Sequence, residues 1–260
     1  MTHDISYISM VLGLLLLAVP VYFFRRFGVR QTGATLMATT RMVVQLFLIG
    51  LYLKYLFLWN SPLINILWVM VMVVVAAFTA AKRTRLKLKT ILIPLSVAFM
   101  GAALLVGLYF LTAVLRLPSP FDARYFIPIM GILMGNMLGV NVLALNTYYD
   151  GIARERQLYY YLLGNGATHI EAVTPFIRKA IEKSFAPCIA NMAVMGIVSL
   201  PGTMIGQILG GSAPGIAIKY QMMIVVITFV ASMLSLMCTL YLADERSFDG
   251  YGRIRNVRSK

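Results

Sequence analysis

Amides and sulfur atoms are the side-chain groups that could do chemistry inside the long apolar segments of this chain, because no acid lies there. All nine Asp and Glu residues fall in polar breaks or near the ends of the sequence. Proton- and cation-driven pumps usually keep an ionisable residue within the membrane to carry charge. The chain also has no G-x-x-x-x-G-K-[ST] loop to hold nucleotide phosphates. If the protein moves a solute uphill, a partner must therefore supply the energy.

Methionine pairs at helical spacing are the only hint of a metal site. Met130 is followed by Met134, and Met192 is followed by Met195. Thioethers suit soft cations such as Cu(I), whereas iron is better held by carboxylate, imidazole or thiolate. Methionine in an apolar chain mostly fills space in the core, and the two cysteines also lie in apolar runs. We therefore predict no metal site.

A few amide side chains and one Pro-Gly pair interrupt the apolar runs. Asn136 and Asn141 could line a path for a solute or could hydrogen-bond across packed helices, and the sequence leaves both open. Pro201-Gly202 lacks one backbone donor, which predicts a kink or break. Such breaks expose backbone groups to a cavity in transporters, although a kink can also simply improve packing. The candidate path residues are Gln45, Asn136, Asn141, Ser199, Pro201, Gly202 and Gln207.

Three glycines recur at every fourth position of one apolar run, at Gly131, Gly135 and Gly139. A stripe of small residues on a membrane helix lets another helix approach closely. We therefore predict that these glycines form a helix-packing face.

The elements that must position these residues are membrane-spanning helices. Hydrophobic residues make up 60% of the chain and charged residues 12%, against about 25% charged in a typical soluble domain. A run of roughly 20 apolar residues is long enough to cross a bilayer. The sequence therefore predicts an all-α polytopic membrane protein with about seven transmembrane helices. The runs cover about 5–24, 39–59, 62–81, 91–113, 125–149, 186–210 and 220–242.

Positive charge is concentrated in every second connection between these runs. Basic residues collect on the cytoplasmic side of a membrane, so we expect the N-terminus outside and the C-terminus in the cytoplasm. This alternation explains the net charge of +14 without a nucleic-acid partner. We expect one transmembrane domain over residues 1–260, with a cytoplasmic loop at about 150–185 and a basic cytoplasmic tail at about 243–260. The connections that are rich in basic residues contain Arg25, Arg26, Arg30, Lys82, Arg83, Arg85, Lys87, Lys89, Arg154, Arg156, Arg178, Lys179 and Lys183.

The loop at about 150–185 has unusually clear helix boundaries. A helix that continues out of the fifth run is expected to end at Gly164-Asn165-Gly166. Thr168 and Glu171 then have the spacing of a capping box, which starts a new helix. We expect that helix to be short, because Pro175 biases the residue before it out of the helical region. The short helix is a candidate coupling element, and an ordinary solvated connector is the alternative.

Three segments of the chain carry a family resemblance. Together with the loop above, they resemble the FetB-like permeases of ABC transporters, formerly called YbbM, which have plant aluminium-tolerance relatives. The matching residues are Arg41 to Leu46 with Gly50; Ile127-Pro128, Met130-Gly131, Met134-Gly135-Asn136 and Asn141; and Val198 to Gly211 with Pro214 and Tyr220-Gln221. The loop residues Gly166-Ala167-Thr168, Glu171-Ala172 and Pro175 also resemble the family.

The resemblance implies a permease subunit that pairs with a second copy of itself and with two ABC-type ATPase subunits in the inner (cytoplasmic) membrane. ATP and Mg would be bound by the ATPase, and this chain would bind no cofactor. The implied ATPase-coupling residues are Gly164, Gly166, Ala167, Thr168, Glu171, Ala172 and Pro175. The family loop is similar to the E-A-A-x-x-x-G loop of ABC importer permeases, but here Tyr159 to Leu163 stand where its acidic-alanine start would be.

The function expected from these features is transport, with iron export implied by the resemblance. A channel or facilitator that works without a partner is the alternative, because amide-lined paths also suit conduction. A retinal protein would need a lysine in the last run and an acidic counter-ion, and the runs hold neither. An intramembrane enzyme would need a convergent base and acid, which are also missing. We therefore expect a transport subunit in contact with membrane lipid and no nucleic acid.

Overall fold

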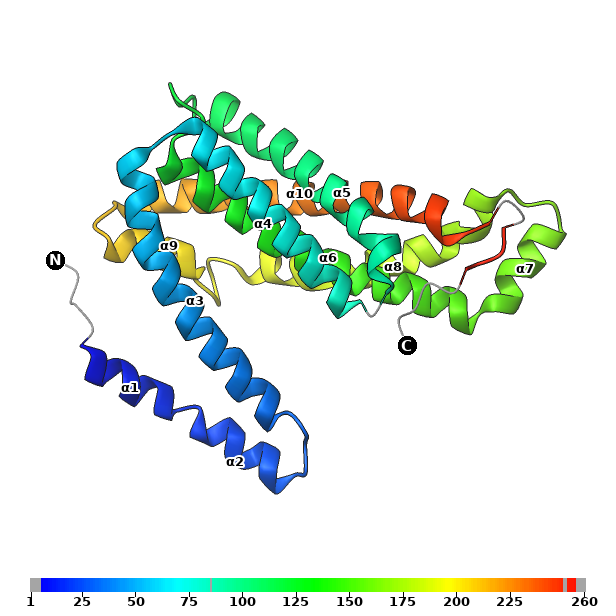
Figure 1. The fold of residues 1–260 in the computed structure, drawn as a ribbon, viewed down its shortest axis with the longest axis horizontal. Coiled ribbons are helices and arrows are strands. Elements are labelled where there is room, and N and C mark those ends of the chain that lie inside the picture. Colours follow the sequence, from blue (N-terminus) through cyan, green and yellow to red (C-terminus); the bar gives the residue numbers. More distant parts are fainter. Residues whose placement is uncertain (1–5, 85, 250–251, 256–260) are drawn as a thin grey trace.

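The computed structural model describes residues 6–84, 86–249 and 252–255, and the regular elements in these ranges are all helices (Figure 1). This confirms the all-α prediction. The helices are α1 (Tyr7–Leu15), α2 (Ala18–Arg26), α3 (Thr32–Trp59), α4 (Pro62–Arg83), α5 (Leu88–Tyr109) with the π-helical turn η1 (Phe110–Val114), α6 (Ala123–Arg154), α7 (Arg156–Gly164), α8 (His169–Val194), α9 (Gly202–Leu209) and α10 (Pro214–Ser247). Arg85, the start of the first predicted run and residues 250–251 and 256–260 of the predicted tail lie outside the described residues.

Six helical segments of the described chain are long and apolar enough to cross a membrane, counting α1 with α2 and α5 with η1 as one segment each. The predicted run at 186–210 is not one helix, because α8 ends at Val194 and α9 begins at Gly202. Between them Gly196 has a φ of 86°, which a helix cannot contain, and Pro201 lacks the N–H that would continue one. The predicted break in this run is thus confirmed, and the seven-span count remains a prediction.

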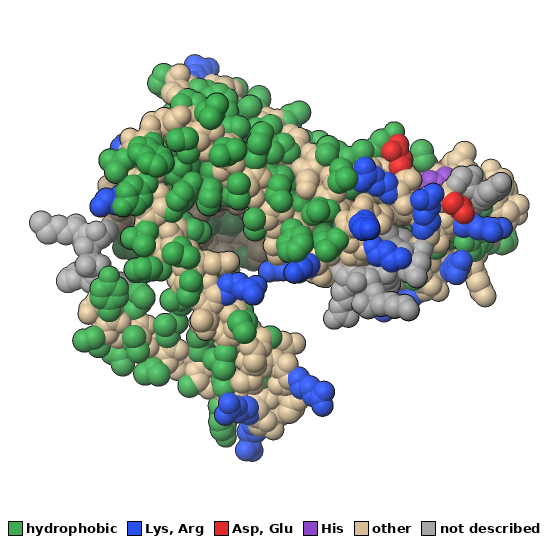
Figure 2. Space-filling model, in the orientation of Figure 1, with side chains coloured by type: hydrophobic (Ala, Val, Ile, Leu, Met, Phe, Trp, Pro, Cys, Tyr) green, Lys and Arg blue, Asp and Glu red, His purple; other side chains and the backbone are tan. Residues whose placement is uncertain are grey.

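The core of the molecule is a five-helix bundle in which α4, α5, α8 and α10 pack around the long helix α6. Small residues let these helices approach closely. A Cβ atom at Gly107 of α5 would lie 2.6 Å from Cε of Met130 on α6, and one at Gly151 of α6 would lie 3.2 Å from the ring of Phe176 on α8. Hydrophobic side chains also cover the outside of the bundle, as a lipid-facing surface requires (Figure 2).

The first three helices form a hairpin that stands away from the bundle (Figure 1). No described residue of α1 or α2 is buried, and Leu56 is the only buried residue of α3. The hairpin joins the bundle near the turn between α3 and α4, where the α3 helix ends on Asn60 in a left-handed conformation with φ 38°.

The two ends of the bundle differ in character. At one end, here called the turn end, the short connections α3–α4, η1–α6 and α9–α10 lie near one another (Figure 1). Asn60 Oδ1 there accepts from the Ala123 N–H at 2.9 Å, and Asn65 Nδ2 donates to the Phe121 carbonyl at 2.8 Å. The opposite end, here called the α7 end, holds α7 and the start of α8. Lys and Arg side chains gather toward it and at the α2–α3 turn (Figure 2).

Helix α8 both confirms and corrects the predictions for the cytoplasmic loop. Its capping box forms as predicted, with Thr168 Oγ1 accepting from the Glu171 N–H and Glu171 Oε2 accepting from the Thr168 N–H. The predicted break at Pro175 is wrong, because α8 continues through it to Val194. The buried face of α8 runs across the proline through Ala172, Phe176 and Ala180, so packing on α6 outweighs the lost backbone hydrogen bond.

Candidate functional site

A cavity of about 250 Å³ lies between α6, the end of α8, α9 and α10, and we call it the mid-bundle cavity. It forms because the first half of α8 packs tightly on α6, whereas the last two turns of α8 leave no residue buried. Its walls carry amides, hydroxyls and sulfur atoms, and no charged side chain. The lining residues are Ile132 and Asn136 of α6; Cys188, Asn191, Met192 and Met195 at the end of α8; Thr203 of α9; and Gln221, Ile224, Val225, Thr228, Phe229 and Ser232 of α10.

A second, wider pocket of about 580 Å³ adjoins the first toward the turn end, and we call it the outer pocket. The two share Ile132, Thr203 and Ile224 as lining residues. Where they meet, the Thr203 hydroxyl donates to Gln221 Oε1, which joins α9 to α10. The outer pocket also contains Arg124. The two volumes thus follow one another along α6 and α10, with one hydrogen bond between helices at their junction.

The structure places the predicted path residues in four different surroundings. Asn136 lines the mid-bundle cavity and Gln207 lines the outer pocket. Asn141 is fully buried and lines neither, because its Nδ2 donates to Met137 O at 2.9 Å and to Ser235 Oγ at 2.8 Å on α10. Its geometry fits the packing interpretation. Gln45 is exposed on α3, away from both volumes.

The remaining predicted path residues lie in or beside the break between α8 and α9. Ser199 is exposed, and its carbonyl accepts from the Gly196 N–H at 2.9 Å. Pro201 is the residue before α9 and Gly202 is its first residue. Thr203, the second residue of α9 after this break, lines both volumes. These residues shape the wall of the cavity, and whether solute touches them stays a prediction.

The predicted glycine stripe has little contact within this chain. A Cβ atom at Gly131 would lie 3.3 Å from Cε of Met72 on α4, but Gly135 and Gly139 have no atom that close and are exposed. The stripe is therefore free to receive a helix that does not belong to this chain, and its packing role stays a prediction.

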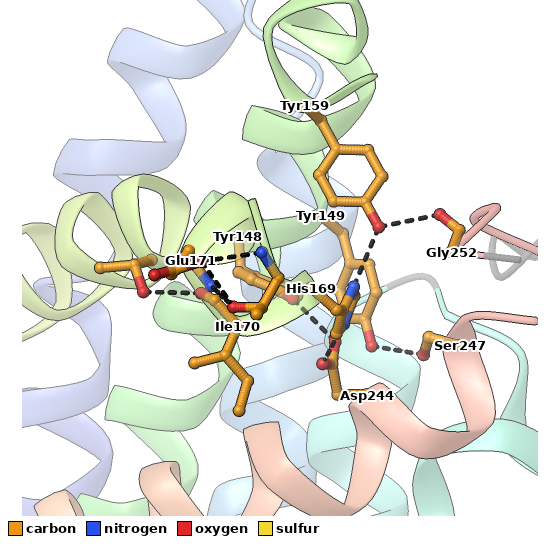
Figure 3. A network of polar contacts seen from close by, with 11 residues as sticks. Tyr148, Tyr149, Tyr159, His169, Ile170, Glu171, Asp244, Ser247 and Gly252 are labelled. Atoms are coloured by element: carbon orange, nitrogen blue, oxygen red, sulfur yellow. Dashed lines mark hydrogen bonds and ion pairs between the residues drawn. The ribbon is translucent and has the colours of Figure 1, made fainter. Parts of the chain in front are cut away.

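A polar network closes the α7 end of the bundle (Figure 3). His169, the first residue of α8, places Nε2 at 2.5 Å from Asp244 Oδ2 on α10. Tyr148 of α6 donates to the other carboxylate oxygen, Oδ1, at 2.9 Å. Tyr159 of α7 lies 3.0 Å from His169 Nδ1 and donates to the Gly252 carbonyl at 2.8 Å. The Asp244 carboxylate of α10 thus contacts α6 and α8 directly, and the contact between His169 and Tyr159 extends the network to α7 and to the segment after α10.

Aromatic rings pack against this network, in which the His169 and Asp244 side chains remain 32% and 21% exposed. The Phe248 ring lies 4.5 Å from the His169 imidazole and 5.7 Å from the Tyr159 ring, measured between centroids. Burial, together with the Asp244 carboxylate, raises the pKa of Tyr159 to about 12. Tyr149 and Ser247 form a second hydroxyl contact beside it at 2.7 Å. A neutral phenol, an imidazole and a carboxylate held this way form a structural clasp between helices.

Most of the predicted ATPase-coupling residues lie at the exposed turn between α7 and α8, whereas Ala172 is buried on α8 and Pro175 lies inside that helix. Gly164 ends α7, Gly166 has a φ of 89°, and Thr168 with Glu171 caps α8. Two hydrophobic side chains beside this turn face solvent, Tyr161 with 67% and Ile170 with 70% of their surfaces exposed. Exposed apolar groups on a polar end of a protein are typical of a contact with another protein. We call the segment from Arg156 to Glu171 the α7 tip.

Sequence reasoning found the turn between α7 and α8 but missed the clasp and the exposed side chains of Tyr161 and Ile170 beside that turn. His169 gave no signal, because its partner Asp244 lies 75 residues away and no metal-ligand spacing connects them. The hint that was present is Asp244 itself, an acid directly after the last apolar run. Among the described residues, no three His, Cys, Asp or Glu side chains gather into a metal site.

Comparison with known proteins places the chain in a family. The family described as Uncharacterised protein family (UPF0014) matches residues 7–248. The chain belongs to this family. UPF0014 membrane protein STAR2 of rice is 30% identical over 236 residues, which cover 90% of this chain and 80% of the rice protein. No solved structure matches this chain.

Two further UPF0014 relatives carry names that mention transport or a metal. "Probable iron export permease protein FetB" of Escherichia coli is 27% identical over 248 residues, covering 95% of this chain and 94% of that protein. "Protein ALUMINUM SENSITIVE 3" of Arabidopsis thaliana is 31% identical over 213 residues, covering 81% of this chain and 76% of the plant protein. The resemblance found in the sequence is therefore confirmed, and this UPF0014 chain is a multi-pass membrane protein.

Proposed function

We propose that this UPF0014 chain is the transmembrane permease subunit of an ABC transporter that exports a metal or a metal-related solute, with iron suggested by the name of FetB. Two copies would pair with two ATPase subunits, which bind ATP and Mg, in the inner membrane. The N-terminus would lie outside and the α7 end in the cytoplasm. Membrane lipid would surround the bundle.

The arrangement of cavity, clasp and tip is the observation that supports this proposal. The mid-bundle cavity and the outer pocket lie toward the turn end, while buried Tyr148, Tyr149 and Ile152 fill the interior of the bundle at the α7 end. A further pocket of about 540 Å³ lies beside the clasp, and His169, Asp244 and Phe248 are among its lining residues. The clasp stands between this packed end and the α7 tip. A push on the tip would therefore act on α6, α8 and α10 together, because each contributes a residue to the clasp.

A rigid tip is what such a push requires. The α7 helix, the turn around Gly166 and the capped start of α8 are joined by backbone hydrogen bonds from the Ala167 N–H to Leu162 O and from the Gly166 N–H to Leu163 O. A segment fixed in this way moves as one body, whereas a loose loop would absorb the movement of a partner. Tyr161 and Ile170 give the partner an apolar surface to hold.

Affinity purification of the tagged chain from native membranes in mild detergent, followed by mass spectrometry, tests the proposal. We expect an ABC-type ATPase in equal amount. The Ile170→Asp variant should lose it, because a charge would replace the exposed apolar side chain at the tip. Lys183→Asp, which also lies exposed on α8 but about 20 Å further along the helix, should retain it. Recovery of the wild-type chain alone would favour a channel that works without a partner.

A further inference from the structure

The mid-bundle cavity brings together three sulfur side chains that the sequence did not place in one site. Cys188 and Met192 lie one turn apart on α8, Met195 is the extended residue that directly follows α8, and all three line the cavity. The spacing from Cys188 to Met192 corresponds to a rise of about 6 Å along the helix, and flexible thioether side chains allow neighbouring sulfur atoms to converge. Cys188 is a free thiol.

We propose that this cavity binds a soft monovalent metal ion, Cu(I) or a cation of similar chemistry, through Cys188 Sγ and the thioethers of Met192 and Met195. Thiolate and thioether ligands select such ions. The assignment as a transported substrate rests on the proposed permease function. The binding site itself depends only on the cavity and its sulfur atoms.

The two methionine pairs differ in burial, and this difference distinguishes candidate metal ligands from side chains that fill the core. Met130 and Met134 of α6 are buried, with 0% and 3% of their surfaces exposed, and the end of the Met130 side chain fills the space beside Gly107. Met192 and Met195 are only partly buried and border open volume. The first pair is packing, and the second pair has space beside it for an ion.

Charge balance in the cavity favours a monovalent ion. No Asp, Glu, Lys, Arg or His lines it, and a net charge deep in a membrane protein is costly. One thiolate with one monovalent cation gives a neutral complex, whereas a ferrous or ferric ion would leave uncompensated positive charge. The oxygens on the facing wall are amides and hydroxyls, and those of Thr203 and Gln221 are already paired with each other.

Binding must release one proton. The thiol of Cys188 gives its proton to solvent as sulfur bonds to the ion, so the site changes from thiol plus cation to a neutral thiolate complex plus a proton. At pH values below the pKa of the thiol, each increase of one pH unit should therefore raise the metal affinity about tenfold.

Titration of the purified, reduced full-length chain with Ag(I) in chloride-free buffer tests the site without any partner. Ag(I) is the probe because it shares the ligand preference of Cu(I) and resists oxidation. We expect saturable binding with one proton released per bound ion. Loss of an outer-shell partner lowers metal affinity about 10- to 100-fold, and loss of a ligand should cost at least as much. Cys188→Ser and Met192→Leu should both show such a loss.

Two matched substitutions serve as controls. Cys238→Ser removes the other cysteine, and Met222→Leu removes an exposed methionine, both of α10 and neither lining the cavity. Both controls should retain the proton-releasing site. Equal affinity in Cys188→Ser and wild type, or loss of the site in Cys238→Ser alone, would overturn the proposal. Intact Ag(I) binding in a chain that recruits no ATPase would instead contradict the permease function and leave the site standing.

Discussion

His169 Nε2 lies 2.5 Å from Asp244 Oδ2, although 75 residues separate the two in the sequence. The contact joins the first residue of α8 to the last turns of α10, and Tyr148 and Tyr159 extend it to α6 and α7. Every helix that reaches the α7 end and lines the mid-bundle cavity is thus connected through one carboxylate.

Asp244→Asn should loosen the clasp. The substitution keeps the shape of the side chain and removes the charge that holds His169, and a hydrogen bond to a charged group contributes about 1.5–3 kcal/mol. We expect a lower melting temperature of the purified protein and faster amide hydrogen exchange in α7. Glu245→Gln, at the next position of α10 and exposed, should change neither. Unaltered exchange in Asp244→Asn would mean that the clasp holds nothing together.

Tyr159→Phe should alter how stability depends on alkaline pH. The pKa of Tyr159 is raised to about 12 in the folded protein by burial and the Asp244 carboxylate, from an ordinary value of 10.0. The folded state therefore keeps the phenol protonated, a contribution fully present below pH 10 and lost as pH rises toward 12. Melting temperatures measured from pH 8 to 11.5 should fall more steeply in wild type than in Tyr159→Phe. Parallel curves would contradict this role.

Thr168→Ala should fray the start of α8. The substitution removes the capping hydroxyl, which typically costs about 1 kcal/mol, and hydrogen exchange at Ile170 and Glu171 should quicken.

Capping hydrogen bonds from the Thr168 backbone and side chain lower the pKa of Glu171. The stability from this carboxylate is present above its ordinary range and disappears as pH falls through the lowered value. Glu171→Gln should therefore flatten the acid dependence seen in wild type, and an unchanged acid profile would speak against the capping box.

Asn136 and Asn141 should respond differently to substitution. Asn141→Leu removes the hydrogen bond to Ser235 and should lower the stability of the α6–α10 contact by about 1–3 kcal/mol. Asn136→Leu affects a side chain that lines the cavity and donates only to Ile132 O of its own helix. It should leave the melting temperature nearly unchanged and reduce transport in reconstituted vesicles. If Asn141→Leu reduced transport without lowering the melting temperature, and Asn136→Leu did the opposite, Asn141 and not Asn136 would line the path of the solute.

Most of the helical architecture could be predicted from the sequence, because long apolar runs have few alternatives in a membrane. The length of the apolar runs placed α4 within about two residues of its observed ends, and α6 and α10 within about six. The glycines around Gly166 and the capping box of Thr168 and Glu171 were also found, since each depends on residues close together in the chain. Local chemistry is readable without tertiary structure.

Only the tertiary structure decided which residues meet. It carried α8 through Pro175, because the apolar face of Ala172, Phe176 and Ala180 packs on α6 and compensates for a lost hydrogen bond. It paired His169 with Asp244 and brought α6 and α10 opposite Cys188 and Met192 to form one cavity. The reason is physical: contacts between distant segments depend on how helices pack, and packing is a property of surfaces that only the folded chain brings together.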